Sequence, residues 1–344
     1  MSDHEATRDG IAPRAPGREA IVGSGADAVE PVTRRRRARR GGEQPMVPEA
    51  QFSSYYNKAI INSPVWKAPD IAGYLFLGGL AGASSALGAG AQLTGRPALA
   101  RASKLAAAGA VSLSFTALVH DLGRPARFFN MLRTFKPTSP MSVGSWLLSA
   151  YAPATMVAAL SAATGHGRRF ANLATAGAAT IGPLVATYTA ALISNTAVPS
   201  WHEGYREMPF VFATSAMSAA AGVGLLAAPG AETAPVRRLG AVSGISEVAL
   251  TKLMVRRMGL VGEAYALGKA HRYGRLALTL TTLGAVGAAG CGPRRWLAQL
   301  SGAALVAGSA LERFAIFESG FISAENPKYT VVPQRMRAAA RAGG

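Results

Sequence analysis

The sequence predicts an all-α integral membrane protein with eight transmembrane helices. Of its 344 residues, 49% are hydrophobic and only 16% are charged, well below the quarter that is typical of soluble domains. Long stretches carry no charged side chain, as between Asp70 and Arg96 or between Arg169 and His202. About 20 mostly apolar residues are enough to cross a bilayer as a helix. These observations favour a multi-pass membrane protein over a soluble one.

Eight segments approach this length. The predicted spans are 71–95, 99–119, 143–164, 171–195, 209–229, 239–256, 275–291 and 297–317. The first and the fourth lie in the two uncharged stretches, and the third lies in another, between Lys136 and His166. The second starts with Arg101 and Lys104, whose long side chains can reach back to the interface. The sixth and the eighth are the least apolar, because they contain Glu247, Lys252, Glu312 and Arg313.

Small side chains dominate the first span, which contains the run GGLAGASSALGAGA over Gly78–Ala91. Small residues allow helix backbones to approach closely in lipid. The run looks like a glycine-rich phosphate loop, but no strand precedes it and no lysine follows it. It therefore predicts helix packing rather than a nucleotide site.

The first and the fifth spans begin with similar sequences. WKAPDIAGYLFLGGLAGASSALG starts at Trp66, and WHEGYREMPFVFATSAMSAAAGVG starts at Trp201. Both place a tryptophan and polar residues before a proline, an aromatic–x–Phe triplet and a run of small residues. A duplication into two four-helix bundles would explain the pair. Chance similarity between two small-residue helices explains it almost as well.

Much of the net charge of +18 lies in a hydrophilic N-terminal tail over residues 1–50. The tail lacks apolar periodicity and contains the run TRRRRARR at Thr33–Arg40, so it is predicted to be disordered. A basic tail can bind nucleic acid, but anionic lipid headgroups suit it better here, and no nucleic-acid partner is expected. Lys and Arg are nearly balanced between the loops of the two membrane sides, and only the basic tails favour cytoplasmic termini.

The sequence offers few ligands for a resident metal or haem. Its histidines lie in the tail, at span ends or in loops: His4, His120, His166, His202 and His271. Axial haem ligands would be expected inside the spans. The single cysteine, Cys291, cannot hold an iron–sulfur cluster, which needs about four cysteines. No haem, iron–sulfur cluster or zinc spacing is therefore predicted in this chain, and any cluster must belong to a partner.

Polar side chains gather at one predicted membrane face. They are Asp70 and Tyr74 at the start of the first span, His120, Asp121 and Arg124 at the end of the second, and Tyr188 near the end of the fourth. An up-and-down topology brings these positions to the same side. Such a set suits a pocket at the membrane edge and a docking platform for another protein. Ordinary interfacial anchoring by aromatic and basic residues is the alternative.

The segment that joins the second and third spans carries a specific motif. HDLGRPARFFNMLRTFKPTSPMSVGSWLLSAYAP begins at His120 and includes Asp121–Pro125, Ser139–Ser142, Gly144 and Trp146. Together with YLFLGGLAG, YTAALISNTAVPSW and ERFAIFESGFISAENPKYTVVPQR, it resembles the NrfD/PsrC family, the membrane subunits of polysulfide-reductase-type complexes. The resemblance covers about residues 55–335.

This resemblance implies a fold and a role. It implies eight transmembrane helices in two four-helix bundles, within a membrane domain over 51–325 that a C-terminal tail over 326–344 follows. Such subunits are not themselves catalytic. They anchor a four-cluster iron–sulfur ferredoxin-like subunit and a molybdopterin catalytic subunit in the cell inner (plasma) membrane. They exchange electrons with menaquinone or ubiquinone, which is an exchangeable substrate, and generally hold no haem.

The resemblance also implies a quinone pocket between the start of the first span and the end of the fourth. By motif, this indicates Tyr74 and Tyr188, with Asp121 and Arg124 close by. The complete predicted quinone set is Asp70, Tyr74, His120, Asp121, Arg124 and Tyr188. The long basic tail departs from the compact pattern of the family.

Glu247 and Lys252 form a second candidate site within the sixth span, because ionisable residues inside a membrane are usually functional. Their spacing places them about 140° apart on an ideal helix, so each is expected to pair with a neighbouring span. They predict a proton path or an internal ion pair. The alternative is that Lys252 extends to the near interface while Glu247 is protonated.

Two other functions compete with a quinone-reactive anchor. A secondary transporter could use Glu247 and Lys252 for ion coupling, although the paired broken helices typical of transporters are not evident. A purely structural membrane anchor would have the same spans and motif without a quinone site. An adjacent gene for a cysteine-rich ferredoxin-like protein would favour either anchor over the transporter.

Overall fold

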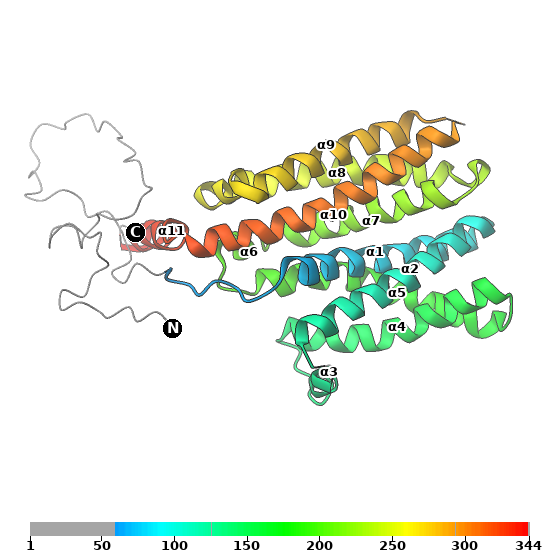
Figure 1. Cartoon of the computed structure of the whole chain (residues 1–344), viewed down its shortest axis with the longest axis horizontal. Coiled ribbons are helices and arrows are strands. Elements are labelled where there is room, and N and C mark those ends of the chain that lie inside the picture. Colours follow the sequence, from blue (N-terminus) through cyan, green and yellow to red (C-terminus); the bar gives the residue numbers. More distant parts are fainter. Residues whose placement is uncertain (1–58, 125, 293, 343–344) are drawn as a thin grey trace, which may run out of the picture. The chain divides into compact units, whose positions relative to one another are not determined.

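The computed structural model describes residues 59–124, 126–292 and 294–342. These residues form helices and no strand, which confirms the predicted all-α class. The predicted tail over 1–50 lies outside the described residues, as does Pro125. The chain divides into two compact units. Residues 64–322 form the larger unit (Figure 1), and the described part of the second comprises 59–63 and 323–342.

Eight long helices run through the described residues in the order of the predicted spans. They are α1 (Ala68–Leu93), α2 (Pro97–Leu122), α4 (Pro140–Thr164), α5 (Arg168–Ser194), α7 (Met208–Ala227), α8 (Ala234–Arg257), α9 (Gly268–Gly290) and α10 (Arg295–Glu325). The shorter elements are α3 (Ala126–Met131), α6 (Pro199–His202), the 3-10 segments η2 (Gly230–Glu232) and η3 (Gly259–Ala266), and α11 (Lys328–Ala342). The last of these occupies most of the predicted C-terminal tail.

Among the described residues, six helices are long and apolar enough to cross a membrane: α1, α2, α4, α5, α7 and α10. The chain is therefore a multi-pass membrane protein. The helices α8 and α9, where two further spans were predicted, are not among the six. Charged residues lower their apolarity: Arg237, Arg238, Glu247, Lys252, Arg256 and Arg257 in α8, and Lys269, Arg272 and Arg275 in α9. The predicted number of eight spans is not confirmed.

Most predicted bounds lie within a few residues of the helix ends, and the larger differences concern the last three long helices. The helices α8 and α9 begin earlier than predicted, at Ala234 and Gly268. The helix α10 continues to Glu325, well past the predicted end at residue 317. The prediction stops each span at charged residues, whereas a helix can continue through them where their side chains reach solvent or the interface.

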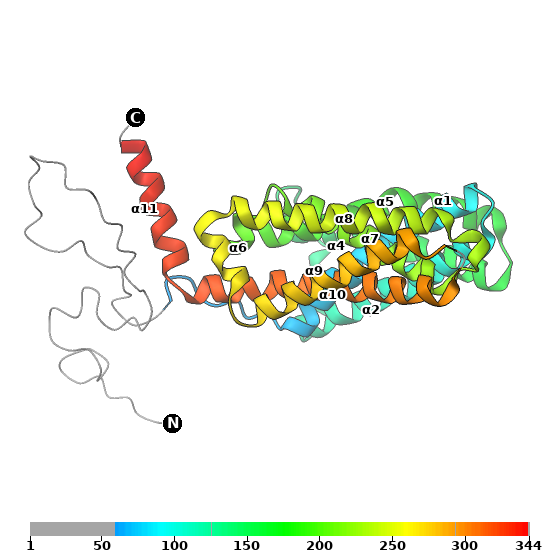
Figure 2. The ribbon, with the colours of Figure 1, turned by 90° about the horizontal axis from the view of Figure 1, so that it is seen from above.

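Close glycine contacts join the long helices. A Cβ atom on Gly82 of α1 would collide with the carbonyl oxygen of Gly182 of α5, and the reverse substitution would also collide. Gly222 of α7 and Gly302 of α10 approach each other in the same way. The views in Figures 1 and 2 show α1, α2, α4 and α5 running alongside one another, and α7, α8, α9 and α10 doing the same. Small residues permit this close backbone contact, as predicted from the composition of the spans.

The two tryptophans of the similar span starts meet in the structure. The rings of Trp66 and Trp201 are stacked, with their centroids 5.7 Å apart. Trp201 is fully buried, and its indole N–H donates to the carbonyl of Ile316 at 2.8 Å. A Cβ atom on Gly320 would collide with the Trp201 ring. The Trp201 indole thus holds together the start of α1, the segment before α7 and the later part of α10.

Candidate functional site

The connector between α2 and α4 (residues 120–142) is shaped by the motif residues themselves. Gly123 follows α2 with a φ of 71°, in the region that favours glycine. Ser139 caps α4, because its hydroxyl accepts the backbone N–H of Ser142 at 3.4 Å. The Ser142 hydroxyl donates to the carbonyl of Thr134 and accepts from the N–H of Lys136, each at 3.0 Å. Local hydrogen bonding therefore accounts for part of the motif.

The start of α1 and the end of α2 meet through charged side chains. The Nδ1 atom of His120 and a carboxylate oxygen of Asp70 lie 2.9 Å apart. Asp121 lies within electrostatic range of Asp70, His120 and Lys67. The His120 side chain is 67% exposed, so the pair contributes at most about 1 kcal/mol to stability. Its main consequence is to orient an accessible imidazole at the membrane edge.

Arg124 and Tyr74 have different environments from this pair. Arg124 lies exposed in the connector, outside every ion pair found in the described part of the chain. Tyr74 is buried in α1, and its backbone carbonyl accepts the Ser114 hydroxyl of α2 at 3.2 Å. Of the predicted quinone residues, Asp70, His120 and Asp121 are thus brought together, whereas Tyr74 belongs to the contact between α1 and α2.

Tyr188 lies against the start of α4, just past the connector. A Cβ atom on Gly144 would overlap the Tyr188 ring, with its Cδ2 atom only 2.8 Å away and its Cζ atom 2.9 Å away. The glycine of the motif therefore makes room for this half-buried ring. The sequence alone named both residues but gave no sign of their contact, since they lie on different helices.

A buried polar pair close to this region was missed by the sequence analysis. The hydroxyls of Tyr151 of α4 and Ser85 of α1 lie 2.7 Å apart, and both residues are buried. Tyr151 is part of the quoted motif, but a tyrosine in an apolar span gives no sequence signal for its partner. The pair links α1 and α4 through a hydrogen bond inside the helix assembly.

A family model described as "Polysulphide reductase, NrfD" matches residues 57–283, which is more than half of the chain. The chain belongs to the NrfD family. No curated protein matches it. The family match includes the connector, Gly144 and Tyr188, and it ends within α9. NrfD proteins are membrane subunits of molybdopterin oxidoreductase complexes, and the family is generally associated with quinones.

A second charged cluster of this NrfD protein lies inside the helix assembly. Arg313 of α10 is 1% exposed and donates to the Glu312 carboxylate at 3.2 Å and to the carbonyl of Phe212 at 3.1 Å. Its guanidinium carbon also lies 3.9 Å from the centroid of the Phe212 ring. The Thr251 hydroxyl of α8 donates to the other oxygen of Glu312. Both charges of the pair are therefore buried and directly bonded.

Glu247 and Lys252 are not partners in this cluster. Glu247 is 2% exposed, with Glu312, Ser215 and Ser218 as polar neighbours. None of the described residues lies in hydrogen-bonding geometry with its carboxylate oxygens. Lys252 is exposed. The internal ion pair of this region joins Glu312 and Arg313. Both residues lie on α10, which the spacing of Glu247 and Lys252 within α8 could not indicate.

A cavity of about 440 Å³ opens beside these acids, between α8, η3, α9 and α10, with a mostly apolar lining that contains several polar side chains. Glu247 and Glu312 line it, together with Thr251 and Lys252. Tyr265, His271 and Arg275 add polar groups from η3 and α9. None of the six predicted quinone residues lines this cavity. The protein thus has two separate polar regions, one at the connector and one in the second group of helices.

Proposed function

We propose that this NrfD protein is the quinone-reactive membrane anchor of a multi-subunit oxidoreductase. It passes electrons between the quinone pool, either menaquinone or ubiquinone, and an iron–sulfur partner subunit. The observation that carries the proposal is the gathering of Asp70, His120 and Asp121 where two apolar helices end. Tyr188, a fourth predicted quinone residue, packs on Gly144 of the motif and supports the same site.

The chemistry of quinol oxidation suits these groups. Removing two electrons from a quinol releases two protons, so the site needs hydrogen-bond partners and a proton acceptor. Asp70 holds Nδ1 of His120, which leaves Nε2 to accept a proton. The Tyr188 hydroxyl can donate to a quinone carbonyl. Because this chain has a single cysteine, the electrons must continue to a cluster on a neighbouring subunit.

The connector also supports the proposed partners. Phe129 and Phe135 are 71% and 59% exposed, and Arg127 and Arg133 lie beside them in the sequence. Aromatic and arginine side chains are enriched at protein interfaces. We propose that the four-cluster iron–sulfur subunit docks here and connects the quinone site to the molybdopterin catalytic subunit. The complex would then be a respiratory enzyme of the cell inner membrane, with this chain as its non-catalytic anchor.

Replacing Tyr188 with phenylalanine tests the quinone site, because it removes one hydroxyl and keeps the ring on Gly144. Losing a neutral hydrogen bond costs about 0.5–1.5 kcal/mol, so the quinol affinity should fall about two- to tenfold. The measurement is quinol-linked turnover of the assembled complex against quinol concentration. Tyr273→Phe is the matched control, since Tyr273 packs on Phe314 in the other group of helices.

The outcomes of this experiment separate the competing functions. Assembly with the iron–sulfur subunit should be unchanged, because the ring of residue 188 still packs. An intact complex with an unchanged quinol dependence would remove Tyr188 from the site. A wild-type complex that exchanges no electrons with quinol would instead favour the purely structural anchor, and ion transport without a partner subunit would favour the transporter.

We also propose that Glu247 and the cavity beside it take part in a proton path. Glu247 lines this cavity together with Thr251, Tyr265 and His271, whose polar groups could carry a proton. A buried carboxylate without a hydrogen-bond partner is costly when charged, which favours a group that takes up and releases a proton. Lys252 lines the same cavity and is exposed, so its amino group could take up or release a proton there.

Glu247→Gln should keep the complex assembled, because it retains the shape of the side chain and removes a buried ionisable group. Proton uptake coupled to quinol turnover should fall by about tenfold or more if the carboxyl carries the proton. Leu278→Val is the control, since it changes the lining of the same cavity without removing a titratable or hydrogen-bonding group. If Glu247→Gln retains wild-type assembly, turnover and proton uptake, Glu247 has no part in such a path.

We further infer that α8 and α9 cross the membrane and that the long helices form two four-helix bundles. The matching contacts Gly82–Gly182 and Gly222–Gly302 support this, because each joins the first and the last helix of one group of four. The stacked tryptophans at the similar span starts fit a duplication. Cysteine-accessibility mapping of the turns that flank α8 and α9 tests the number of crossings.

A further inference from the structure

The end of the helices opposite the connector is strongly basic. The short turns between α1 and α2, α4 and α5, α7 and α8, and α9 and α10 lie at this end, which is here called the short-turn end (Figure 1). Its cations are Arg96, Arg101, Lys104, Arg168, Arg169, Arg237, Arg238, Arg294 and Arg295. Among the described residues, the carboxylate at this end is Glu232, which accepts the backbone N–H groups of Ala98 and Leu99. The basic charge is therefore largely uncompensated.

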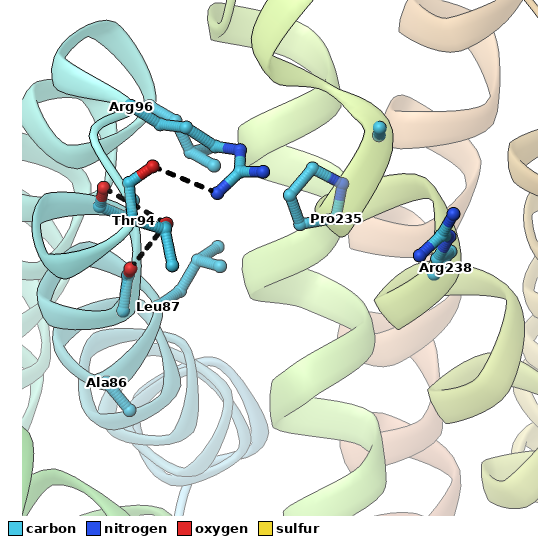
Figure 3. A pocket seen from close by; sticks show the side chains of 10 residues that line it. Ala86, Leu87, Thr94, Arg96, Pro235 and Arg238 are labelled. Atoms are coloured by element: carbon cyan, nitrogen blue, oxygen red, sulfur yellow. Dashed lines mark hydrogen bonds between the residues drawn. The ribbon is translucent and has the colours of Figure 1, made fainter.

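A cleft of about 500 Å³ opens at the short-turn end between α1, α2 and α8. Arg96 and Arg238 lie on opposite walls of it (Figure 3). Its apolar lining includes Leu87, Ala91 and Leu99, and the last two are only 3% and 1% exposed. The cleft thus combines a charged rim with a floor formed by the apolar core.

Neither arginine of the rim is neutralised by an acid. The ion pairs found in the described residues include neither Arg96 nor Arg238. Arg96 is half-buried, and its Nη1 donates at 3.3 Å to the carbonyl of Thr94 in its own turn. Arg238 is exposed. Both guanidinium groups therefore retain donors that can bind an anion.

A second cleft, of about 370 Å³, shares Arg96 and lies on the other side of the turn between α1 and α2. Arg101, Lys104 and Arg168 line it. Lys104 donates to the side chain of Gln92, a neutral partner that leaves its charge in place. Arg96 therefore lines both clefts, and each cleft has at least one further cationic side chain in its walls.

We propose that the cleft between α1, α2 and α8 binds an anionic phospholipid of the surrounding bilayer. Arg96 and Arg238 would hold the phosphate, and an acyl chain would cover the partly exposed apolar lining at Ala86, Leu87 and Pro235. Guanidinium groups bind phosphate with paired hydrogen bonds, and basic groups at helix ends attract anionic headgroups. A zwitterionic lipid would bring its ammonium group to an already positive surface, and inorganic phosphate would leave the apolar floor uncovered.

The test uses the full chain, purified in detergent and stripped of lipid. Phosphatidylglycerol or phosphatidylcholine is then added, and binding is followed by native mass spectrometry and by the melting temperature. The test variant is Arg96→Gln with Arg238→Gln. The control is Arg169→Gln with Arg294→Gln, which removes the same charge from the same end without changing either cleft. Inorganic phosphate is titrated as a separate arm.

Phosphatidylglycerol should bind wild type more tightly than phosphatidylcholine and raise its melting temperature more. The test variant should lose about tenfold in affinity for phosphatidylglycerol, and the control should stay within about twofold of wild type. An equal loss in both variants would show a general charge effect and overturn the site. Equal binding of both lipids, or equal stabilisation by phosphate alone, would overturn the proposed ligand. If the double variant does not fold, Arg238→Gln alone carries the test, because residue 238 is exposed.

Discussion

Replacing Arg313 with leucine is expected to prevent the protein from accumulating as a folded membrane subunit. Removing one partner of a buried ion pair costs about 3–5 kcal/mol, because the remaining charge is left without compensation. Here Glu312, itself 4% exposed, would keep only the Thr251 hydroxyl, and the carbonyl of Phe212 would lose its donor. The measurement is the yield of folded chain recovered from the membrane in detergent and, for the chain that is recovered, its thermal unfolding followed by circular dichroism.

Two further variants show whether the charge pair or the packing is responsible. Arg275→Leu removes an exposed arginine that lines the cavity beside Glu312, and it should change stability by less than about 0.5 kcal/mol. Replacing Glu312 and Arg313 together with leucine should recover much of the loss, because an apolar pair needs no compensation. A single Arg313→Leu variant that melts like wild type would contradict the role of the guanidinium.

The long helices could be predicted from the sequence because lipid demands long apolar segments. The uncharged stretch after Asp70 predicted a span over 71–95, and α1 runs over Ala68–Leu93. The charged helices were harder to delimit. The last span was predicted to end at 317, before Glu318, whereas α10 continues to Glu325. Glu312 and Arg313 made this span one of the least apolar, although the two side chains bond each other. Hydropathy counts such a pair as two charges and cannot recognise that they compensate each other.

The candidate site could be predicted only as a set of residues. Asp70, His120 and Asp121 stood out as polar residues at the ends of predicted spans, and an up-and-down topology was enough to place them at one membrane face. It could not show that Asp70 holds Nδ1 of His120. In the same way, the spacing of Glu247 and Lys252 indicated partners on other helices but not which ones. Contacts between helices depend on how each helix is rotated about its own axis and how deep it lies in the membrane. Small residues lie on every face of these helices, so the sequence determines neither.

Gly144→Ala is expected to lower quinol-linked turnover more than Tyr188→Phe does. This expectation rests on the proposed quinone site. A Cβ atom on residue 144 would lie 2.8 Å from Cδ2 of Tyr188, closer than real contacts allow, so the ring must move. A displacement of about 1 Å at a reacting group can cost about a hundredfold in rate. The measurement is turnover of the assembled complex at saturating quinol, alongside recovery of the iron–sulfur subunit.

Gly177→Ala is the matched control, because Gly177 lies in the same helix as Tyr188 and a Cβ atom there would have no neighbour within 4 Å. It should leave turnover unchanged and stabilise the helix slightly, by up to about 1 kcal/mol. Combining Gly144→Ala with Tyr188→Leu should keep the complex assembled without restoring turnover, since the smaller side chain leaves room for the methyl group but has no hydroxyl. Full turnover in Gly144→Ala would mean that the position of the Tyr188 ring does not matter for electron exchange with quinol.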